Sequence, residues 1–380
     1  MIIALNVILI ALLVVPALYY FVFALAAKIK KANSHSEARC ESRFVLLVPA
    51  YKSDAFIMPT VMAALNQDYP KELFRVLVIS DGMSEITDEN LRQKGAEVLR
   101  VKFENSTKAA SLKSAMEYLG AGAADYAVIL DSDNIIGIEF LKAMNCALAG
   151  RRVAVQAHRC AKNTDTPVAV ADALFEEVNN LVFRDRHNAL GLSSALIGSG
   201  MAFPYDWFYG AAGSFETAGE DKEMELRLLR DGIFVEYAGD IRVLDEKTRS
   251  ISNLQKQRKR WLNSQSYLML RALREFPKAK LKLGFLDKLF QWLFLPRIII
   301  LVALPLSALA FLLAGSGYMY VYVSACLLLF TAIALGKPKY LTWKSLVKEI
   351  WLLPKMLVLT MRNIFSRKEK KDTYIHTEHL

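Results

Sequence analysis

One stretch of the sequence decides the fold, and it reads Tyr126-Ala127-Val128-Ile129-Leu130-Asp131-Ser132-Asp133-Asn134. Its apolar, partly β-branched first half is typical of a buried parallel strand. Two carboxylates, Asp131 and Asp133, follow at the point where the tip of such a strand meets a ligand crevice. A solvated turn is the competing interpretation, because Asp, Ser and Asn also form turns. The surrounding segments distinguish the two interpretations.

Strands and helices are predicted to alternate around this stretch. The runs Phe44–Val48, Arg75–Ser80 and Ala96–Val101 read as strands, whereas Asp54–Asn66 and Lys108–Leu119 have helical spacing. Such alternation requires right-handed crossovers between parallel strands. We therefore expect a doubly wound α/β domain with a parallel sheet and a crevice at the carboxyl ends of its strands.

Polar side chains follow several of these strands. Tyr51 and Asp81 come after the first two strands, and Asp131 and Asp133 after the fourth, so all four should converge at one edge of the sheet. No GxGxxG or GxxxxGK(S/T) sequence occurs, which disfavours a dinucleotide-dependent enzyme and a P-loop NTPase. A carboxylate pair in place of a glycine loop suggests that a divalent cation handles the phosphates of a ligand.

The composition favours a membrane protein. Of the 380 residues 54% are hydrophobic, and the mean hydropathy is +0.24. No charged residue occurs from Ile2 to Ala27, which exceeds the roughly 20 residues needed to cross a bilayer. A cleaved signal peptide is the alternative, but no Lys or Arg precedes this apolar run. We expect a retained transmembrane helix whose basic end, Lys28 to Lys31, is cytoplasmic.

The net charge of +10 also points to the membrane. Lys and Arg residues gather beside apolar segments, for example at Arg258–Arg260 and Lys278–Lys282, which suits anionic lipids of the inner leaflet better than nucleic acid. The four cysteines show no CxxC spacing, so neither a zinc site nor a disulfide framework is indicated. Reduced cytosolic thiols are expected.

The second half of the chain contains further apolar stretches. Leu289–Leu313 and Tyr318–Leu335 are joined by an uncharged turn and predict a transmembrane hairpin whose tip faces outward. Pro354 interrupts Val347–Phe365, which is expected to lie in the membrane interface. The predicted division is a transmembrane helix (1–27), a linker (28–43), the α/β domain (44–250), interfacial helices (251–285), a transmembrane hairpin (286–335), and an interfacial helix with a cytoplasmic tail (336–380).

Two polar motifs lie between these regions. Gly198-Ser199-Gly200-Met201-Ala202-Phe203 is either a place where backbone approaches a ligand closely or an ordinary glycine turn. Glu220 and Asp221 open a helical run, Lys222–Arg230, which Gly232 closes. Acids at a helix start are often only favourable partners of the helix dipole. A carboxylate held there is also well placed to accept a proton in a cleft.

A third motif is Gln257-x-x-Arg260-Trp261. Trp261 beside basic residues on an amphipathic helix could serve only as an interfacial anchor. An indole is equally a flat platform for a sugar ring, while Gln and Arg can bind hydroxyl and phosphate groups.

Four motifs thus stand in order: Val48-Pro49-Ala50-Tyr51, Ser80-Asp81-Gly82, Asp131-Ser132-Asp133, and Glu220-Asp221 followed by Gln257-x-x-Arg260-Trp261. Their order and spacing resemble those of the family 2 inverting glycosyltransferases. The similarity is to the membrane-embedded branch, which includes cellulose, chitin and hyaluronan synthases and ceramide glucosyltransferase. It covers roughly Phe44 to Trp261 and implies a GT-A-like fold.

The resemblance implies a role for each matching residue. Asp81 matches the acid that reads the uracil of a UDP-sugar, with Pro49 and Tyr51 lining the base, and Lys108 matches a lysine near the nucleotide. The pair Asp131 and Asp133 matches the DxD element, whose second acid coordinates Mg²⁺ or Mn²⁺. Asp221 matches the catalytic base, and the acceptor or product site is assigned to Gly200, Glu220, Gln257, Arg260 and Trp261.

The resulting hypothesis is a metal-dependent inverting glycosyltransferase. It would use a UDP-sugar to extend a polysaccharide or to glycosylate a lipid-linked acceptor, with its catalytic domain on the cytoplasmic side of a cell membrane such as the bacterial inner membrane. Three spanning helices are few to wall a polysaccharide channel, so a homo-oligomer or a partner membrane subunit would help. The alternatives are single transfer to a membrane lipid, a nucleotidyltransferase, and a non-catalytic membrane scaffold.

Overall fold

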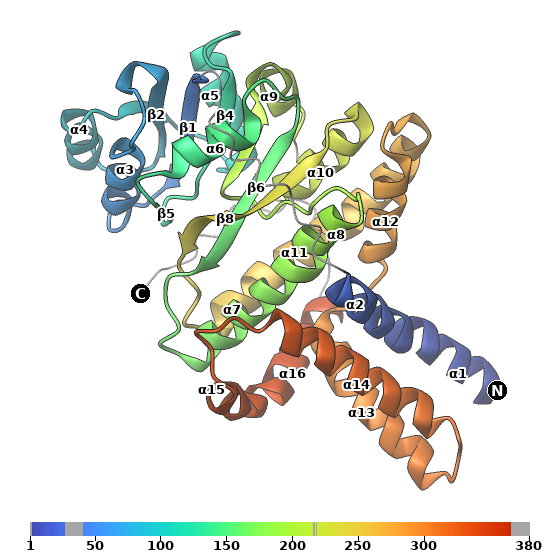
Figure 1. The fold of residues 1–380 in the computed structure, drawn as a ribbon. Helices are drawn as coiled ribbons and strands as arrows, with labels where there is room; N and C mark the ends of the chain where they lie inside the picture. Colours follow the sequence, from blue (N-terminus) through green and yellow to red (C-terminus); the bar gives the residue numbers. More distant parts are fainter. Residues whose placement is uncertain (1, 27–40, 216, 218, 366–380) are drawn as a thin grey trace.

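A computed structural model describes residues 2–26, 41–215, 217 and 219–365, and an eight-stranded sheet lies at the centre of its upper half (Figure 1). Most of the predicted linker and all of residues 366–380 lie outside the described residues. The strand order is β3-β2-β1-β4-β7-β6-β8-β5. The strands are β1 (Phe44–Tyr51), β2 (Phe74–Asp81), β3 (Glu97–Val101), β4 (Tyr126–Ile129), β5 (Ile135–Ile136), β6 (Ala154–Ala161), β7 (Met201–Pro204) and β8 (Val235–Asp245).

The prediction of a parallel sheet is right for only part of it. Strands β1 to β4 are parallel, whereas β7 runs antiparallel to both β4 and β6. The reason is that β7 begins at the carboxyl end of β4, where Met201 pairs with Ile129 and Gly200 N donates to Ile129 O at 2.9 Å. The loop before β7 therefore crosses the sheet edge at which the predicted site residues gather.

Helices cover both faces of the sheet, as the doubly wound prediction requires. Alternate residues of β1 separate the two cores: Phe44 packs with the helices of one face, and Val45 with those of the other. Helices α3 (Ile57–Leu65), α4 (Glu85–Gln93) and α6 (Phe140–Leu148) belong to the first core. Helices α5 (Lys108–Leu119), α9 (Tyr205–Ala212) and α10 (Glu220–Asp231) belong to the second.

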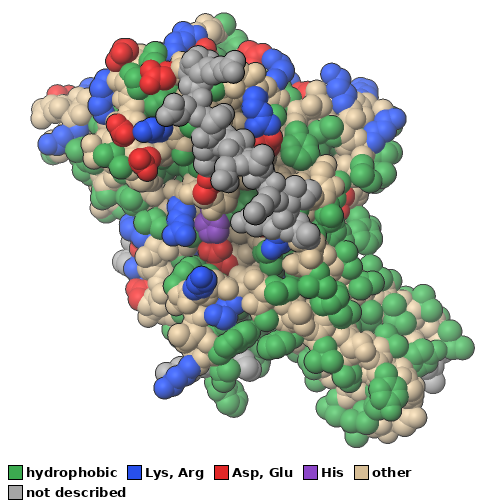
Figure 2. Space-filling view, in the orientation of Figure 1, with side chains coloured by type: hydrophobic (Ala, Val, Ile, Leu, Met, Phe, Trp, Pro, Cys, Tyr) green, Lys and Arg blue, Asp and Glu red, His purple; other side chains and the backbone are tan. Residues whose placement is uncertain are grey.

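The apolar stretches form long helices below the sheet. α1 (Ile2–Leu9) continues through a π-helical turn (Ile10–Val14) into α2 (Val15–Leu25), and α13 (Arg297–Leu313) pairs with α14 (Met319–Gly336). Among the described residues, Ile3–Leu25 and Met319–Gly336 are each long and apolar enough to cross a membrane. Figure 2 shows hydrophobic side chains over the helices at the lower right and charged ones over the sheet domain.

The first arm of the predicted hairpin starts later than expected. Residues from Leu289 belong to α12 (Lys282–Trp292), and α13 begins only at Arg297, after Pro296. Proline cannot donate a helical hydrogen bond, so the chain bends there, by 62° between the two helices. If this bent pair is one span, the described residues have three candidate spans.

Several helices lie between the sheet and the apolar bundle (Figure 1). They are α7 (Pro167–Asn179), α8 (Arg186–Ala189) and α11 (Ile251–Glu275). Two further helices, α15 (Trp343–Lys348) and α16 (Leu353–Phe365), lie below them, where α15 contacts α7 and α16 contacts α11 and α13. A π-helical turn, Asn180–Asp185, joins α7 to α8. Val178 at the end of α7 and Val182 in this turn are buried with Leu13 and Tyr322 of the apolar helices. The sheet domain therefore packs directly on the predicted membrane helices.

A partly buried polar cluster reinforces this junction. Tyr19 Oη on α2 donates to Asp287 Oδ1 at 2.6 Å, and Gln291 Nε2 donates to Asp287 Oδ2 at 2.7 Å. His187 Nε2 lies 3.0 Å from Asp287 Oδ2. These four side chains join α2, α8 and α12, which are distant in sequence.

The packing of α14 on α7 is testable at Gly336. A Cβ at this position would lie 2.9 Å from Val178 Cα, closer than packed atoms tolerate. We expect Gly336→Ala to destabilise the detergent-solubilised protein by about 1–3 kcal/mol, the usual cost of overpacking, and thus to lower its Tm by several degrees. Gly317→Ala, where a Cβ meets nothing within 4 Å, is the control. Equal Tm values for the two variants would contradict the described packing.

Candidate active site

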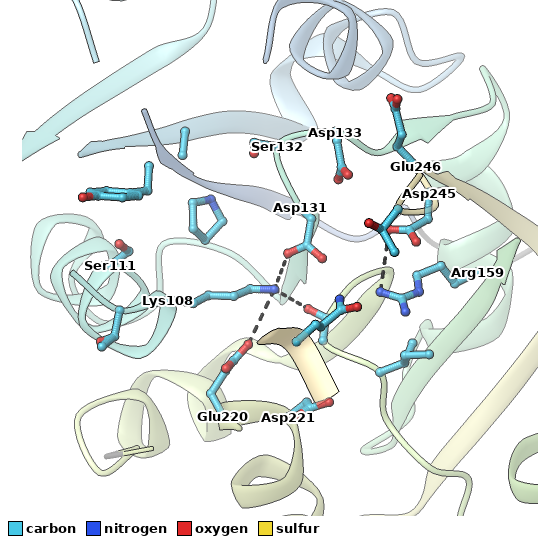
Figure 3. A pocket seen from close by; sticks show the side chains of 18 of the residues that line it. Lys108, Ser111, Asp131, Ser132, Asp133, Arg159, Glu220, Asp221, Asp245 and Glu246 are labelled. Carbon is cyan, nitrogen blue, oxygen red and sulfur yellow. Dashed lines mark hydrogen bonds and ion pairs between the residues drawn. The ribbon is translucent and has the colours of Figure 1, made fainter. Parts of the chain in front are cut away.

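A cavity of about 200 Å³ opens at the carboxyl edge of the sheet (Figure 3). Its walls come from the ends of β1, β2, β4 and β8 and from the starts of α5 and α10. Most of the residues predicted from the sequence line this one cavity: Pro49, Tyr51, Asp81, Lys108, Asp131, Asp133, Glu220, Asp221 and Gln257.

The side chain of Lys108 contacts three segments of the chain inside the cavity. It is the first residue of α5, which Thr107 caps by accepting a hydrogen bond from Ala110 N. Its Nζ donates to Asp131 Oδ1 at 2.5 Å and to Gly198 O at 2.6 Å (Figure 3). Glu220 Oε1 lies 3.7 Å from the same Nζ. The lysine thus fixes the acidic turn after β4 against the loop before β7 and the start of α10.

A buried amide, Asn134, sets the conformation of the acidic turn. Asp131 N donates to Asn134 Oδ1 and to Ser199 Oγ, each at 3.0 Å. In return, Asn134 Nδ2 donates to Asp133 Oδ1 at 3.1 Å and to Asp245 Oδ1 at 3.3 Å. The Asn134 residue is 0% exposed. Sequence reasoning assigned it no role, because its contacts with Ser199 and Asp245, which are 65 and 111 residues away, leave no local signal.

Negative charge accumulates next to this turn. Burial raises the pKa of Asp133 well above its ordinary value, and the carboxylates of Asp245 and Asp131 raise it further. No group of three or more His, Cys, Asp or Glu side chains in the described part of the chain could hold a metal ion by itself. A cation at Asp131 and Asp133 would therefore need further ligands such as water or substrate oxygens.

A network of buried ions, which sequence reasoning missed, lies behind these acids. Arg159 on β6 donates to Glu176 Oε2 at 2.9 Å, and Lys247, which follows β8, donates to Asp245 Oδ2 at 2.8 Å. Lys247 Nζ also lies 3.3 Å from Glu176 Oε2. Burial opposes the ionisation of Glu176, but the cations Arg159, Lys247 and Arg184 outweigh it and hold the pKa of that carboxyl well below its usual range.

Asp81 lies at another side of the cavity. The residue is 4% exposed, and its Oδ2 atom has no hydrogen-bond partner among the described residues. An adjoining open recess of about 690 Å³ shares Tyr51, Asp81 and Ser106 with the cavity and is also lined by Arg100. A buried carboxylate oxygen without a donor is costly, which is typical of an atom that pairs with a ligand.

The start of α10 presents the predicted catalytic acid. Glu220 and Asp221 both line the cavity, and Asp221 Oδ1 accepts a hydrogen bond from Lys222 N at 2.8 Å. The helix ends at Asp231, and Gly232 follows with φ +82°, as the sequence predicted. The contact to a backbone N–H orients the Asp221 side chain at a helix start.

The residues assigned to the acceptor site are only partly described. Gln257 on α11 lines the cavity, whereas the side chains of Arg260 and Trp261 lie outside the described part. Gly200 is not among the lining residues: its φ is +64°, and a Cβ would lie 2.9 Å from Val243 Cγ2, so packing alone explains this glycine. Its role at the acceptor stays a prediction. Gly198, two residues earlier, lines the cavity instead.

The fold and this cavity define a class, the glycosyltransferases of GT-A type. A family model described as "Glycosyltransferase like family 2" matches residues 42–264, and the chain belongs to this family. The fold class and the enzyme class expected from the sequence are thereby confirmed. No protein in the curated set matches the sequence.

Solved structures are similar to this chain at low identity. One is the mannosyltransferase PcManGT from Pyrobaculum calidifontis in complex with GDP-Man and Mn²⁺, with 18% identity and a TM-score of 0.59 over 92% of this chain and 94% of that one. Another is S. aureus TarS 1-349 in complex with UDP-GlcNAc, with 14% identity and a TM-score of 0.47 over 84% and 89%. The first supports the fold along almost the whole chain.

The role of Asn134 can be tested by removing its amide. Asn134→Ala leaves the backbone N–H of Asp131 with one acceptor instead of two and removes the donor to Asp133 and Asp245. We expect a loss of about 1–3 kcal/mol in the free energy of unfolding, because buried polar groups lose partners. Thermal unfolding measures it, with Asn90→Ala on the exposed side of α4 as the control. An unchanged Tm for Asn134→Ala would exclude this role.

Proposed function

We propose that this protein is a membrane-bound inverting glycosyltransferase that transfers a sugar from a UDP-sugar to a polysaccharide or a lipid-linked acceptor. The observation that carries the proposal is that one cavity is lined by the acidic pair Asp131 and Asp133, by the buried acid Asp81, and by Asp221. These are the groups needed to hold a nucleotide diphosphate at one end of a reacting bond and to deprotonate an acceptor at the other.

Asp81 is proposed to recognise the base of the donor. Its Oδ2 atom is buried and has no partner among the described residues, so it can accept a hydrogen bond from a ring N–H such as that of uracil. Pro49 and Tyr51 line the cavity beside it and can pack on the base. The adjoining recess provides the additional volume that a nucleotide requires beyond the central cavity.

Asp133 and Asp131 are proposed to hold a divalent cation, Mg²⁺ or Mn²⁺, together with the donor diphosphate. The chemistry of the two side chains fits such an ion, because both line the cavity and carboxylate oxygens are the ligands that Mg²⁺ and Mn²⁺ prefer. When bound, the ion supplies positive charge against the negative charge that develops on the departing diphosphate.

Lys108 is proposed to act on the same leaving group. Its ammonium group contacts Asp131, lies at the entrance to α5 and lines the cavity. A cation already oriented by Asp131 and by Gly198 O does not need to reorganise as negative charge develops on the β-phosphate. Its role is therefore electrostatic stabilisation of the leaving UDP.

Asp221 is proposed as the general base. A hydroxyl group must lose its proton as it attacks the anomeric carbon, and a single carboxylate within hydrogen-bond reach can accept it. Displacement in one step from the face opposite the diphosphate inverts the anomeric configuration and needs no covalent intermediate. The backbone contact from Lys222 leaves the second oxygen of Asp221 available for this proton.

The membrane location rests on the apolar helices. Two helices of the described chain are long and apolar enough to span a bilayer, and the sheet domain packs on them through α7. We propose that the basic residues Lys28, Lys30 and Lys31 place the catalytic domain on the cytoplasmic side, against membrane lipids. Product sizing then separates a polymerase, which gives a ladder of lengths, from an enzyme that adds one sugar to a lipid.

Turnover with a panel of donors tests the proposal. We expect the purified protein in lipid nanodiscs to release UDP from one UDP-sugar with Mn²⁺ or Mg²⁺, and to stop when EDTA removes the metal. GDP-mannose belongs in the panel because PcManGT is complexed with it. Release of pyrophosphate instead of a nucleoside diphosphate would indicate a nucleotidyltransferase. Failure of every donor, including hydrolysis, would overturn the assignment.

The general base is tested by Asp221→Asn. We expect kcat for transfer to fall by about 10²–10⁴-fold while the donor KM and the Tm change little, because the amide keeps the shape but accepts no proton. Asp68→Asn, on the exposed surface away from the cavity, is the matched control. If Asp221→Asn retained full transfer, the carboxylate could not be the base.

A further inference from the structure

Two acids one turn apart on α7, Asp172 and Glu176, both line the cavity but differ in their partners. Glu176 pairs with Arg159, Lys247 and Arg184 and is 7% exposed. These ion pairs within the protein compensate the negative charge of Glu176. Neither the sequence motifs nor the proposed reaction uses Asp172.

No described residue donates a hydrogen bond to the Asp172 carboxyl group, although the residue is partly buried. Burial raises the pKa of Asp172, and the cations Lys247, Arg258 and Arg159 only partly oppose this. A carboxyl group that is partly desolvated without a donor costs free energy, which a ligand in the cavity can recover. Asp172 therefore presents to the cavity a carboxyl group to which no described residue donates a hydrogen bond.

The neighbours of Asp172 define one wall of the cavity. Gln257 on α11 lines the same cavity and adds an amide with both a donor and an acceptor. The next residue, Arg258, lies over the ring of Phe175 on α7, at 5.9 Å from its centroid. Helices α7 and α11 lie side by side between the sheet and the apolar helices (Figure 1). This wall is thus the part of the cavity nearest to the predicted membrane helices.

The chemistry of this wall selects among possible acceptors. Carboxylate and amide groups bind the vicinal hydroxyl groups of a sugar, which donate and accept hydrogen bonds. An ionised phosphate carries negative charge and only acceptor oxygens, so it cannot donate a hydrogen bond to the carboxylate of Asp172. A simple lipid alcohol has one hydroxyl, which the general base would occupy, and leaves Asp172 without a partner.

We propose that Asp172, together with Gln257, binds the sugar ring of the acceptor, so that the acceptor is a carbohydrate, free or lipid-linked, rather than a bare lipid alcohol or a lipid phosphate. This inference rests on the proposed function, with Asp221 as the base. Asp172 accepts hydrogen bonds from ring hydroxyls that do not react, and thereby directs the reacting hydroxyl to Asp221. It is a specificity-determining residue that takes no part in proton transfer.

The test compares acceptors on the full-length protein in nanodiscs, with the donor that the panel identifies. The probes are octyl glucoside and octyl N-acetylglucosaminide as sugar acceptors, farnesol as a lipid alcohol, and farnesyl phosphate. For Asp172→Ala and Asp172→Asn we expect the KM for the sugar acceptor to rise about tenfold or more, since hydrogen bonds to a charged group are lost. The donor KM and the rate of donor hydrolysis without acceptor stay at wild-type values.

Asp165→Asn is the matched control, because Asp165 precedes α7, is half exposed and bonds to Arg249 outside the cavity. Asp172→Glu should partly restore the acceptor KM if the carboxylate itself binds the sugar. The inference is overturned if the variants keep the wild-type acceptor KM, if the donor KM changes instead, or if the wild type glycosylates only farnesol or farnesyl phosphate. Absence of any donor turnover by the wild type is a different result, and it overturns the proposed function.

Discussion

The ionised carboxylate of Glu176 is the constraint on which the rest of the structure depends. It lies on α7, yet its partners come from β6 (Arg159), from the segment after β8 (Lys247) and from the π-helical turn (Arg184). Removing these charges from water costs several kcal/mol for each ion, and only close mutual pairing offsets that cost. Because the pairing is geometrically demanding, α7 is held at one place against the end of the sheet.

Helix α7 in turn connects the cavity with the apolar helices. One side of it contributes Asp172 and Glu176 to the cavity, and its last turn packs Val178 against Gly336 of α14. Arg297, the first residue of α13, contacts the same helix through the ring and the carbonyl oxygen of Phe175. A membrane-derived acceptor would therefore meet a wall whose position is fixed both by ion pairs with the sheet and by packing on the membrane helices.

Much of the fold could be predicted because its signals are local. Residues Tyr126–Ile129 of the predicted strand form β4, and α5 has the predicted bounds, since side-chain periodicity and capping residues lie within or next to each element. The antiparallel β7 was not predicted, because a strand's direction in a sheet depends on where the preceding loop crosses. The break at Pro296 was missed for a related reason: apolar composition extends through it, and only the proline marks the bend.

The sequence by itself predicted that Asp81, Asp131 and Asp133 meet at the carboxyl edge of the sheet, because parallel strands with buried sides deliver their next residues to one edge. Lys108, at the start of α5, was assigned to the same site only through the family resemblance. It also indicated which parts of the chain form apolar helices, because their composition alone marks them. Only the tertiary structure decided that Asn134 orients the acidic turn and that cations compensate the charge of the Glu176 carboxylate. It also decided that Asp172 lines the cavity. The physical reason is that hydrogen bonds and ion pairs act over a few ångströms in space, between segments whose separation along the chain carries no pattern.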